Sequence, residues 1–374
     1  MFAMQRILVV VGTRPEAIKM APLIRRLRDS KDFATVVCST GQHREMINQV
    51  FSLFSLVPDV DLNVMQPGQS LSDLTARVLM GMDSVIRDHR PDRVLVHGDT
   101  TTTLAATLAA YYHQIPVGHV EAGLRTGNIY APWPEEINRK LADAICDRLY
   151  APTAHARDNL LREGVRSERI LVTGNTVIDA LFDIVNGPLA EARDSLRQRF
   201  AFHDSNKKLV LVTCHRRESF GQGFLNVCDA IGTLADREDV QIVFPVHLNP
   251  NVRTAFKRLE NHPRVSLIEP LDYLEFVYML TECHSILTDS GGIQEEAPSL
   301  GKPVLVMRDV TERPEAVQAG TVKLVGTNTK RIVEAASEVL DNPSAYAAMS
   351  AIHNPYGDGK ACERIISSLR KEST

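Results

Sequence analysis

Short runs of apolar residues, rich in Val, Ile and Leu, alternate along the chain with longer stretches in which apolar and charged residues recur at helical spacing. Short continuous apolar runs are typical of strands that are buried on both faces of a parallel sheet. The runs that we expect to be strands lie at 6–11, 35–39, 93–97, 116–120, 148–151 and 170–172 in the first half, and at 209–213, 241–245, 265–268, 285–287, 303–306 and 321–324 in the second.

This alternation predicts an α/β protein made of two Rossmann-like, doubly wound parallel-sheet domains. A chain of 374 residues is also longer than one hydrophobic core usually supports. We expect an N-terminal domain over 1–175 and a C-terminal domain over 176–356. The stretch 174–204 is polar and helical in pattern, without a strand-like run, and is the expected linker and first helix of the second domain.

The composition is that of an ordinary soluble globular protein, with 44% hydrophobic and 24% charged residues. A net charge of -4 without a basic run gives no electrostatic reason to expect nucleic acid or a membrane surface as partner. The six cysteines are scattered and form no CxxC pair, which favours reduced thiols. The first apolar run is too short for a signal peptide or a membrane span, so we expect a cytoplasmic protein.

The first strand leads into Gly12-Thr13-Arg14-Pro15-Glu16-Ala17-Ile18-Lys19, where a helix begins. Arg14 and Lys19 at that helix start either face a phosphate or are solvated surface charges, and the residues alone weigh the two readings about evenly. One glycine is not GxGxxG, and no GxxxxGK[ST] occurs in the chain, so neither a dinucleotide site nor a P-loop is indicated.

Carboxylates follow two neighbouring strands of the first half and begin the next helix. Asp99 and Glu121 come just after strands, while Glu135 and Glu136 lie at a proline-braced helix start. Each has an ordinary reading, as a turn residue, a cap or an acid beside a helix N-terminus. Several carboxylates in one cleft repel one another, which raises a pKa and produces a group suited to general acid–base chemistry.

The second half offers cations and a glycine turn. His215 and Arg216 follow a strand, and His247 has a weaker claim. The Ser290-Gly291-Gly292 turn lies between a strand and a helix, so its backbone N–H groups can hold a diphosphate. Glu296 is placed to accept hydrogen bonds from ribose hydroxyls, and Arg313 to clamp a phosphate or simply to lie in a surface loop. No His or Cys spacing matches a zinc site, although carboxylates could hold a labile Mg²⁺.

Taken together, the motifs resemble those of the bacterial non-hydrolysing UDP-N-acetylglucosamine (UDP-GlcNAc) 2-epimerases. The segments that carry the resemblance are GTRPEAIK, VHGDTTTT, HVEAGLRT, HRRE and TDSGGIQEEA, in that order, and the match runs from about Arg6 to Gly359. It implies a glycosyltransferase-B (GT-B) architecture with the active site in an interdomain cleft, and a C-terminal helix over 357–374 that returns to the first domain. It also implies a homodimer and no cofactor.

By the same resemblance, the functional residues fall into three groups. The first comprises Asp99, Glu121, Glu135 and His215 as catalytic residues, with Arg14 and Lys19 binding substrate. UDP contacts are expected from Phe276, Ser290, Gly291, Gly292, Glu296 and Arg313. A second UDP-GlcNAc molecule is expected as an allosteric activator at Gln42, Glu136, Arg216 and His247. Two positions depart from the family pattern: Cys214 replaces a Gly, and Leu271 replaces a uracil-contacting Gln.

The chemistry expected is an anti elimination of UDP followed by its re-addition. The C2 hydrogen of the sugar is not next to a carbonyl, so an enzyme must either oxidise C3 or eliminate UDP, and no dinucleotide fingerprint favours oxidation. Glu121 or Glu135 would remove the C2 proton, and Asp99 is one carboxylate that could return a proton to the opposite face. Rival readings are a UDP-sugar glycosyltransferase of the same fold, a hydrolysing 2-epimerase and a catalytically silent nucleotide-sugar sensor.

Overall fold

The computed structural model describes residues 4–42, 44–214, 222–246, 259–351 and 353–372. The chain divides into two compact units. The N-terminal unit comprises Met1–Phe182 and Tyr356–Thr374, and the C-terminal unit comprises Asp183–Pro355. The division falls inside one helix, because Phe182 and Asp183 are both residues of α7 (Thr176–Asn186).

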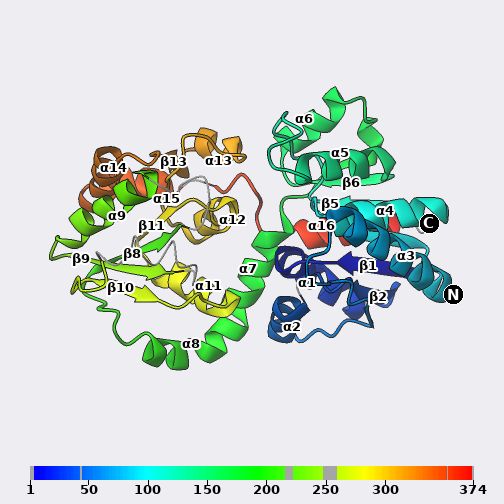
Figure 1. The fold of residues 1–374 in the computed structure, drawn as a ribbon, viewed down its shortest axis with the longest axis horizontal. Coiled ribbons are helices and arrows are strands. Elements are labelled where there is room, and N and C mark those ends of the chain that lie inside the picture. Colours follow the sequence, from blue (N-terminus) through cyan, green and yellow to red (C-terminus); the bar gives the residue numbers. More distant parts are fainter. Residues whose placement is uncertain (1–3, 43, 215–221, 247–258, 352, 373–374) are drawn as a thin grey trace. The chain divides into compact units, whose positions relative to one another are not determined.

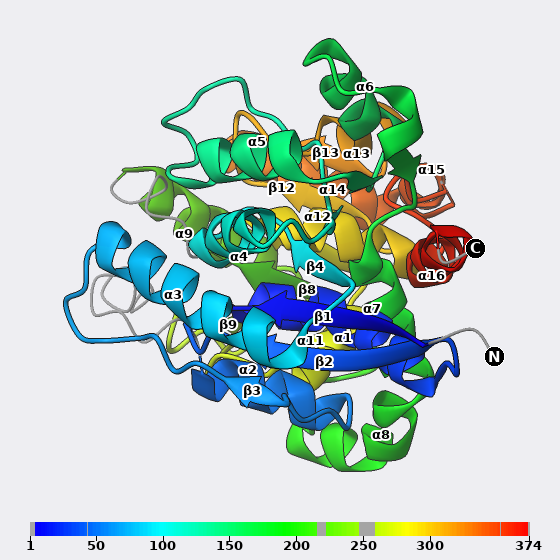
Figure 2. The same cartoon turned by 90° about the vertical axis from the view of Figure 1, so that its right-hand side faces the viewer.

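The N-terminal unit is built on a parallel sheet of seven strands in the order β3-β2-β1-β4-β5-β6-β7 (Figures 1 and 2). Its strands are β1 (Gln5–Val11), β2 (Phe33–Ser39), β3 (Val60–Asp61), β4 (Arg93–His97), β5 (Val117–Val120), β6 (Arg148–Ala151) and β7 (Ile170–Val172). Its helices are α1 (Arg14–Asp29), α2 (Arg44–Leu53), α3 (Leu71–His89), α4 (Thr101–Tyr112), α5 (Glu135–Ile145), α6 (Ala154–Arg162), most of α7, and α16 (Ala361–Glu372), with a 3-10 turn at Ser167–Arg169.

The C-terminal unit repeats this plan with six parallel strands in the order β10-β9-β8-β11-β12-β13 (Figure 1). The strands are β8 (Lys208–Thr213), β9 (Val240–Pro245), β10 (Val265–Ile268), β11 (Ser285–Thr288), β12 (Val304–Val306) and β13 (Val322–Leu324). Its helices are α8 (Pro188–Arg199), α9 (Gln222–Ala235), α11 (Tyr273–Glu282), α12 (Gly291–Glu296), α13 (Pro314–Ala319), α14 (Thr329–Asp341) and α15 (Pro343–Ser350), with a 3-10 turn at Ala297–Leu300.

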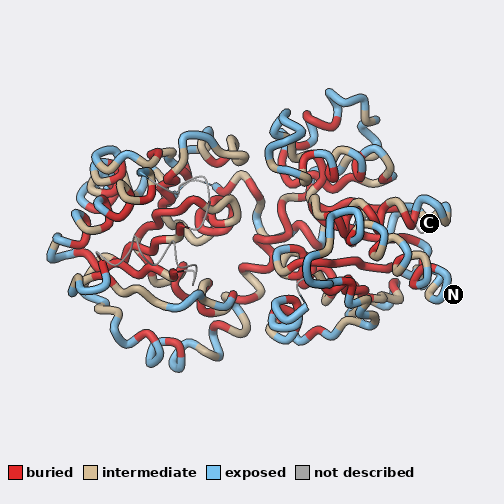
Figure 3. The backbone as a smooth tube through the Cα atoms, viewed as in Figure 1, coloured by how far each residue is buried: buried red, intermediate tan, exposed pale blue. Residues whose placement is uncertain are grey.

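The apolar runs predicted from the sequence form the cores of both units. Leu8, Val94 and Val96 are fully buried in the N-terminal sheet, as are Val212 and Ile242 in the C-terminal sheet. Strand β4 is buried along its whole length, and β8 is buried at all but its two end residues (Figure 3). A strand between two helical layers must be apolar on both faces, which is why continuous runs rather than alternating ones marked these strands.

The expected strands are confirmed, with end points that differ by at most two residues. One strand was missed: β3 is a two-residue strand at the sheet edge, and its Val-Asp sequence carries no apolar run. The predicted linker consists of two helices, α7 and α8. Both sheets have the Rossmann order, in which the chain reverses direction across the sheet between β1 and β4 and between β8 and β11.

Two further expectations concern the state of the cysteines and the presence of membrane-spanning helices. All six cysteines are buried, and none forms a disulfide. Within the described part of the chain, no helix combines the length and the apolar composition that a bilayer crossing requires.

The last helix of the chain belongs to the N-terminal unit. Helix α16 packs against α1, with Cys362, Ile365 and Leu369 buried. The carboxylate of Asp179, in α7, accepts hydrogen bonds from the backbone N–H groups of Ala361 and Cys362, both at 3.0 Å. Asp179 is only 1% exposed and caps two of the N–H groups that the first turn of a helix leaves without partners.

Replacing Asp179 with Ala should release the start of α16. Two buried N–H groups would lose their acceptor, which typically costs about 1–3 kcal/mol. The measurement is native-state hydrogen exchange of the α16 amides, whose opening free energy should fall by that amount.

Asp32→Ala is the matched control. Asp32 accepts a hydrogen bond from Arg370 on the same helix, but both side chains are more than half exposed. Water screens such a pair, so protection of α16 should change far less. Equal loss of protection in the two variants would contradict the capping role of Asp179.

Candidate active site

The turns after β1 and β4 flank the point where strand order reverses in the N-terminal sheet, the usual place for a ligand in such folds. One buried carboxylate joins the two turns. Glu16 accepts hydrogen bonds from the backbone N–H groups of Gly12 (2.8 Å) and Thr13 (2.6 Å), and from the hydroxyl of Thr100 (2.6 Å) after β4. Burial raises the pKa of Glu16, although these hydrogen bonds oppose the rise.

Glu16 was not among the predicted site residues, yet the sequence held a signal for it. Thr13 and Glu16 form a Thr-x-x-Glu capping box at the start of α1. Gly12 is also explained by packing rather than by an unusual backbone angle. A Cβ at Gly12 would lie 2.1 Å from the hydroxyl of Thr102, so only glycine lets the β1 turn approach α4 this closely.

Asp99 follows β4 and is paired with a cation. Its Oδ2 lies 2.8 Å from Nη2 of Arg139 in α5, and its backbone carbonyl accepts a hydrogen bond from Asn138 Nδ2 at 2.9 Å. The side chain is 29% exposed. Burial raises the pKa of Asp99, with nearby Glu121 and Glu135 adding to the rise and Arg139 opposing it. The two other predicted carboxylates therefore both lie within electrostatic range of Asp99.

Glu121 follows β5 in a left-handed backbone conformation, with φ of 68°. Such a conformation costs a residue with a Cβ about 1–3 kcal/mol and is common at functional sites. Its Oε2 accepts hydrogen bonds from Lys19 Nζ and from Asn175 Nδ2, the latter at 2.7 Å. Lys19, expected to bind substrate, thus pairs with a catalytic candidate in this structure.

His97, at the end of β4, lies beside this pair. Its Nε2 is 3.9 Å from Oε2 of Glu121, and its side chain is 3% exposed. Burial lowers the pKa of His97 to about 3, so its ring is neutral at physiological pH. Lys19 is therefore the positively charged neighbour of Glu121, and His97 is not.

A buried network supports the loop that carries Glu121. His119 interacts through Nδ1 with Asp143 and through Nε2 with the carbonyl of Gly98, both at 2.7 Å. Arg125 donates to Asp143 at 2.8 Å. Burial alone would raise the pKa of Asp143, but His119 and Arg125 hold it below its usual value. The network fixes the strand ends on either side of the carboxylates.

The remaining N-terminal candidates have varied surroundings. Glu135 begins α5 and is partly exposed, and Gln42 and Arg14 are also partly exposed. Glu136 is fully buried and accepts hydrogen bonds from the backbone N–H groups of Thr126 and Gly127 at 3.1 Å. Glu136 thus helps to hold the loop before α5.

In the C-terminal unit, the serine-glycine turn lies at the end of β11, beside β8, where strand order reverses. The hydroxyls of Thr213 and Thr288 are 2.6 Å apart, and Thr288 accepts a hydrogen bond from the N–H of Ser290 at 2.9 Å. A Cβ built on Gly292 would meet no described atom within 4 Å. Packing against described residues therefore does not require glycine here, whereas a bound diphosphate would.

The other UDP candidates surround α12. Glu296 is 6% exposed and accepts a hydrogen bond from the hydroxyl of Tyr273 at 2.7 Å. Arg313 forms an ion pair with the buried Glu295, through its Nε. Phe276 lies on α11, in the first turn that Tyr273 begins, and is partly exposed.

Three predicted residues, His215, Arg216 and His247, lie outside the described part of the chain. Of the two departures from the family pattern, Cys214 is buried, which raises the pKa of its thiol, and Leu271 is partly exposed. Among the described residues, no group of three His, Cys, Asp or Glu side chains is arranged to hold a metal ion.

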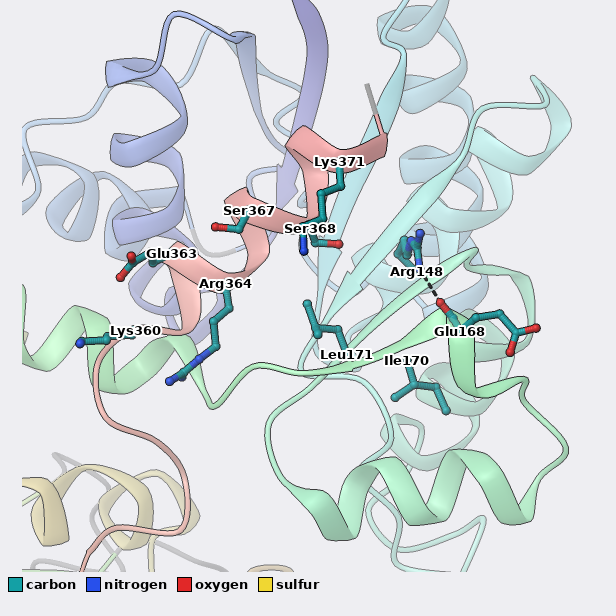
Figure 4. Close-up of a pocket in the computed structure, with 10 residues that line it drawn as sticks. All are labelled: Arg148, Glu168, Ile170, Leu171, Lys360, Glu363, Arg364, Ser367, Ser368 and Lys371. Atoms are coloured by element: carbon teal, nitrogen blue, oxygen red, sulfur yellow. Dashed lines mark hydrogen bonds between the residues drawn. The ribbon is translucent and has the colours of Figure 1, made fainter. Parts of the chain in front are cut away.

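A pocket of about 540 Å³ lies elsewhere in the N-terminal unit, between the edge strand β7 and α16 (Figure 4). Its lining includes Ile170 and Leu171 of β7, and Arg364 and Ser368 of α16. None of the predicted site residues lines this pocket. It is therefore separate from the strand ends that carry the carboxylates.

Several residues of the site were missed because their roles depend on distant partners. Arg139 lies one turn after Glu135 in α5, Asn175 lies 54 positions after Glu121, and Tyr273 lies 23 positions before Glu296. The i, i+4 spacing of Glu135 and Arg139 was a weak signal for the first. No local pattern pointed to the other two pairs.

Comparison with known proteins gives a consistent result. The family described as UDP-N-acetylglucosamine 2-epimerase matches residues 25–370. A protein of that name from Yersinia pestis is 57% identical over 371 residues, which is 98% of each chain. A solved UDP-GlcNAc 2-epimerase from Neisseria meningitidis, bound to UDP-GlcNAc, has a TM-score of 0.91 and 51% identity, over 98% of this chain and 100% of that one.

A more distant solved structure agrees. The UDP-GlcNAc 2-epimerase of Methanocaldococcus jannaschii, in complex with UDP-GlcNAc and UDP, has a TM-score of 0.82 and 35% identity, over 98% of this chain and 100% of that one. The two parallel sheets of Rossmann order and these similarities confirm the expected GT-B-like fold class. With more than half of its residues identical to a relative matched over nearly its full length, this chain belongs to the UDP-N-acetylglucosamine 2-epimerase family.

Proposed function

We propose that this chain interconverts UDP-GlcNAc and UDP-N-acetylmannosamine by anti elimination and re-addition of UDP. The observation that carries this proposal is that Asp99, after β4, has Glu121, after β5, and Glu135, at the start of α5, within electrostatic range in a chain of this family. The Neisseria relative, with 51% identity, binds UDP-GlcNAc, which supports the choice of substrate.

In the first step, a carboxylate takes the C2 proton while the bond between C1 and the β-phosphate oxygen breaks. The C2–H electron pair becomes the C1=C2 double bond of a 2-acetamidoglucal, and UDP leaves with the electrons of the broken C–O bond. In the second step, a UDP oxygen attacks C1, and a proton is delivered to the opposite face of C2. No net redox change occurs, so the cycle needs no oxidant.

The electrostatics of the N-terminal unit support a division of roles. The base must be ionised, and Glu121 accepts hydrogen bonds from Lys19 and Asn175, which favour its charged form. The acid must be protonated, and Asp99 has a raised pKa because it is partly withdrawn from solvent and lies near two other carboxylates, although Arg139 opposes the rise. We therefore assign proton removal in the forward direction to Glu121 and proton delivery to Asp99, with Glu135 keeping the pKa of Asp99 high.

We assign UDP to the C-terminal unit, at the Ser290-Gly291-Gly292 turn. No described atom lies within 4 Å of a Cβ placed on Gly292, and this space and the helix start behind it suit a diphosphate. Glu296, oriented by Tyr273, would accept ribose hydroxyls, Phe276 would contact the nucleoside, and Arg313 would neutralise charge on the leaving group. His215 would add positive charge around the diphosphate, and Arg14 would bind substrate.

The resemblance also carries three proposals about the state of the enzyme. We assign a second UDP-GlcNAc, acting as an activator, to Gln42, Glu136, Arg216 and His247, and we place the enzyme in the cytoplasm. We further propose a homodimer. Exposed apolar side chains on the neighbouring helices α3, α4 and α5 support it, namely Met80, Tyr111, Tyr112 and Leu141.

Incubation with UDP-GlcNAc alone in deuterated buffer should give UDP-N-acetylmannosamine with deuterium at C2, because the C2 proton passes through a carboxylate that exchanges with solvent. Proton NMR detects the sugar product and also reveals the deuterium at its C2. Free N-acetylmannosamine would identify a hydrolysing enzyme, and turnover only with an added acceptor would identify a glycosyltransferase. Binding without turnover or label would contradict the proposal and favour a sensor.

Gly292→Ala should weaken UDP binding without weakening the fold. Alanine is compatible with the backbone and meets no described atom, so stability should be unchanged or higher. The new methyl would occupy the diphosphate site and reduce UDP affinity by about 10-fold or more, which is about 1.4 kcal/mol. Titration calorimetry measures the affinity.

Gly232→Ala in α9 is the matched control. Its Cβ would make an ordinary contact with Leu259 at 3.7 Å. The unit should gain about 0.5–1 kcal/mol of stability from helix propensity, with unchanged UDP affinity. Unaltered UDP binding in Gly292→Ala would contradict the assignment of the diphosphate to this turn.

In the pH profile of kcat, Arg139→Gln should shift the alkaline limb, which is the fall in kcat at high pH, to a higher pH. Arg139 lowers the pKa of Asp99, so its removal raises that pKa and keeps the acid protonated further into the alkaline range. Asp99→Asn should lower kcat by about 10²-fold or more. It should also abolish the fall in kcat at high pH, which would identify Asp99 as the group that causes this fall. Arg157→Gln, which alters an exposed ion pair, is the control. A limb that stays in place or moves to lower pH would contradict the assignment.

A further inference from the structure

Asn175 connects the carboxylate of Glu121 to the start of α7. It lies between β7, which ends at Val172, and the first residue of α7. The side chain is buried, and its Nδ2 donates a hydrogen bond to Oε2 of Glu121 at 2.7 Å. Its backbone is held as well, because its N–H donates to the carbonyl of Tyr356 at 2.7 Å.

The orientation of the Asn175 amide is determined by its other hydrogen bond. The backbone N–H of Val177 donates to Oδ1 of Asn175 at 3.1 Å, as expected for the cap of α7. An N–H group needs an acceptor, so the oxygen of the amide must face Val177. The nitrogen must then face Glu121, where it can only donate. An asparagine in this orientation binds the ionised carboxylate in preference to the protonated form.

Capping alone would not require asparagine. Aspartate and serine cap helices about as well, since the cap needs only a side-chain oxygen. Neither can replace the second contact: an ionised aspartate would present an anion to Glu121, and serine is too short to reach it. The choice of asparagine therefore points to the contact with Glu121.

The charged and titratable groups described around Glu121 come from α1 and from the end of β4. Lys19 of α1 donates to the same oxygen, Oε2, and His97 at the end of β4 lies 3.9 Å away as a neutral ring. Asp99, after β4, is within electrostatic range. Asn175 thus adds a donor without adding a second cation. A second cation would stabilise the carboxylate further and make it a weaker base.

We propose that Asn175 is a positioning residue of the epimerase reaction, whose side-chain amide orients Glu121 and holds it ionised for transfer of the C2 proton. The inference rests on the proposed role of Glu121 as the base. The left-handed backbone of Glu121 supports it, because a carboxylate placed at a conformational cost needs contacts that keep it there. Asn175 and Lys19 supply those contacts from two different elements.

Asn175→Asp tests the proposal, because it retains the side-chain oxygen that caps α7 but replaces the hydrogen-bond donor to Glu121 with a negative charge. The new carboxylate would accept from Val177 as before, but it would face Glu121 with a like charge and raise the pKa of Glu121. The acid limb of kcat should therefore move to higher pH. At neutral pH, kcat should fall by about 10- to 100-fold, with KM for UDP-GlcNAc changed little, because the base is displaced or protonated.

Asn328→Asp is the matched control. Asn328 caps α14 in the C-terminal unit through a hydrogen bond from the N–H of Arg331 at 3.1 Å, so the substitution has the same chemistry at a helix start without a catalytic neighbour. Its kcat and pH profile should equal those of the wild type. A wild-type acid limb and kcat in Asn175→Asp would overturn the proposal, as would equal losses in both variants.

Asn175→Ser provides a second test, should the aspartate variant fail to fold. Serine keeps an acceptor for Val177 and removes the donor to Glu121 without adding charge. We expect kcat to fall by about 10-fold, with retained UDP affinity and a smaller shift of the acid limb than in the aspartate variant. Wild-type kcat in the serine variant would overturn the inference.

The wild-type enzyme separates failure of this inference from failure of the proposed function. If the wild type neither epimerises UDP-GlcNAc nor incorporates deuterium at C2, the proposed function is wrong. If the wild type does both and the Asn175 variants match it, only the role of Asn175 is wrong. Slower C2 exchange in the Asn175 variants, with unchanged UDP binding, is the result that supports the proposal.

Discussion

The structure depends on one constraint, which is that polar groups at the carboxyl ends of buried parallel strands must find partners away from water. A parallel sheet covered by helices on both faces has little solvent at these ends, so unpaired N–H and C=O groups there are costly. The N-terminal unit meets this requirement with buried side chains. Glu16 binds the turns after β1 and β4, and His119 binds the carbonyl of Gly98.

The same side chains that satisfy the backbone also hold the catalytic candidates in place. Asp143 and Arg125 support His119, and the loop that follows carries Glu121 in its left-handed conformation. Asn175 caps α7 with one end of its amide and binds Glu121 with the other. Structural and catalytic needs are therefore met by one network. A substitution in it should alter the pKa of a neighbouring carboxylate as well as the stability of a turn.

In the C-terminal unit, a different kind of side chain holds the strand ends. The Thr213 and Thr288 hydroxyls pair across β8 and β11, and Gln294 donates to the carbonyl of Ser290 while accepting from the hydroxyl of Thr311. These neutral contacts hold the backbone of the serine-glycine turn without placing a carboxylate at Gly292. A diphosphate is an anion, so a binding turn held by hydroxyls and amides avoids repelling it. The two units share a topology, but the chemistry of their strand ends suits a base in one and an anion in the other.

The sequence by itself determined the fold class, nearly all strands and the positions of the motifs, because buried strands and glycine turns are local patterns with a direct physical cause. It also predicted that Asp99 and Glu121 lie near each other, since strand ends of a parallel sheet meet at one edge. Only the tertiary structure decided which partner each carboxylate has. Lys19 binds Glu121, Arg139 binds Asp99, and Asn175 reaches Glu121 across 54 positions of the chain. Such pairings arise from how helices and strands pack, and sequence spacing does not encode distances between elements that meet only in the folded chain.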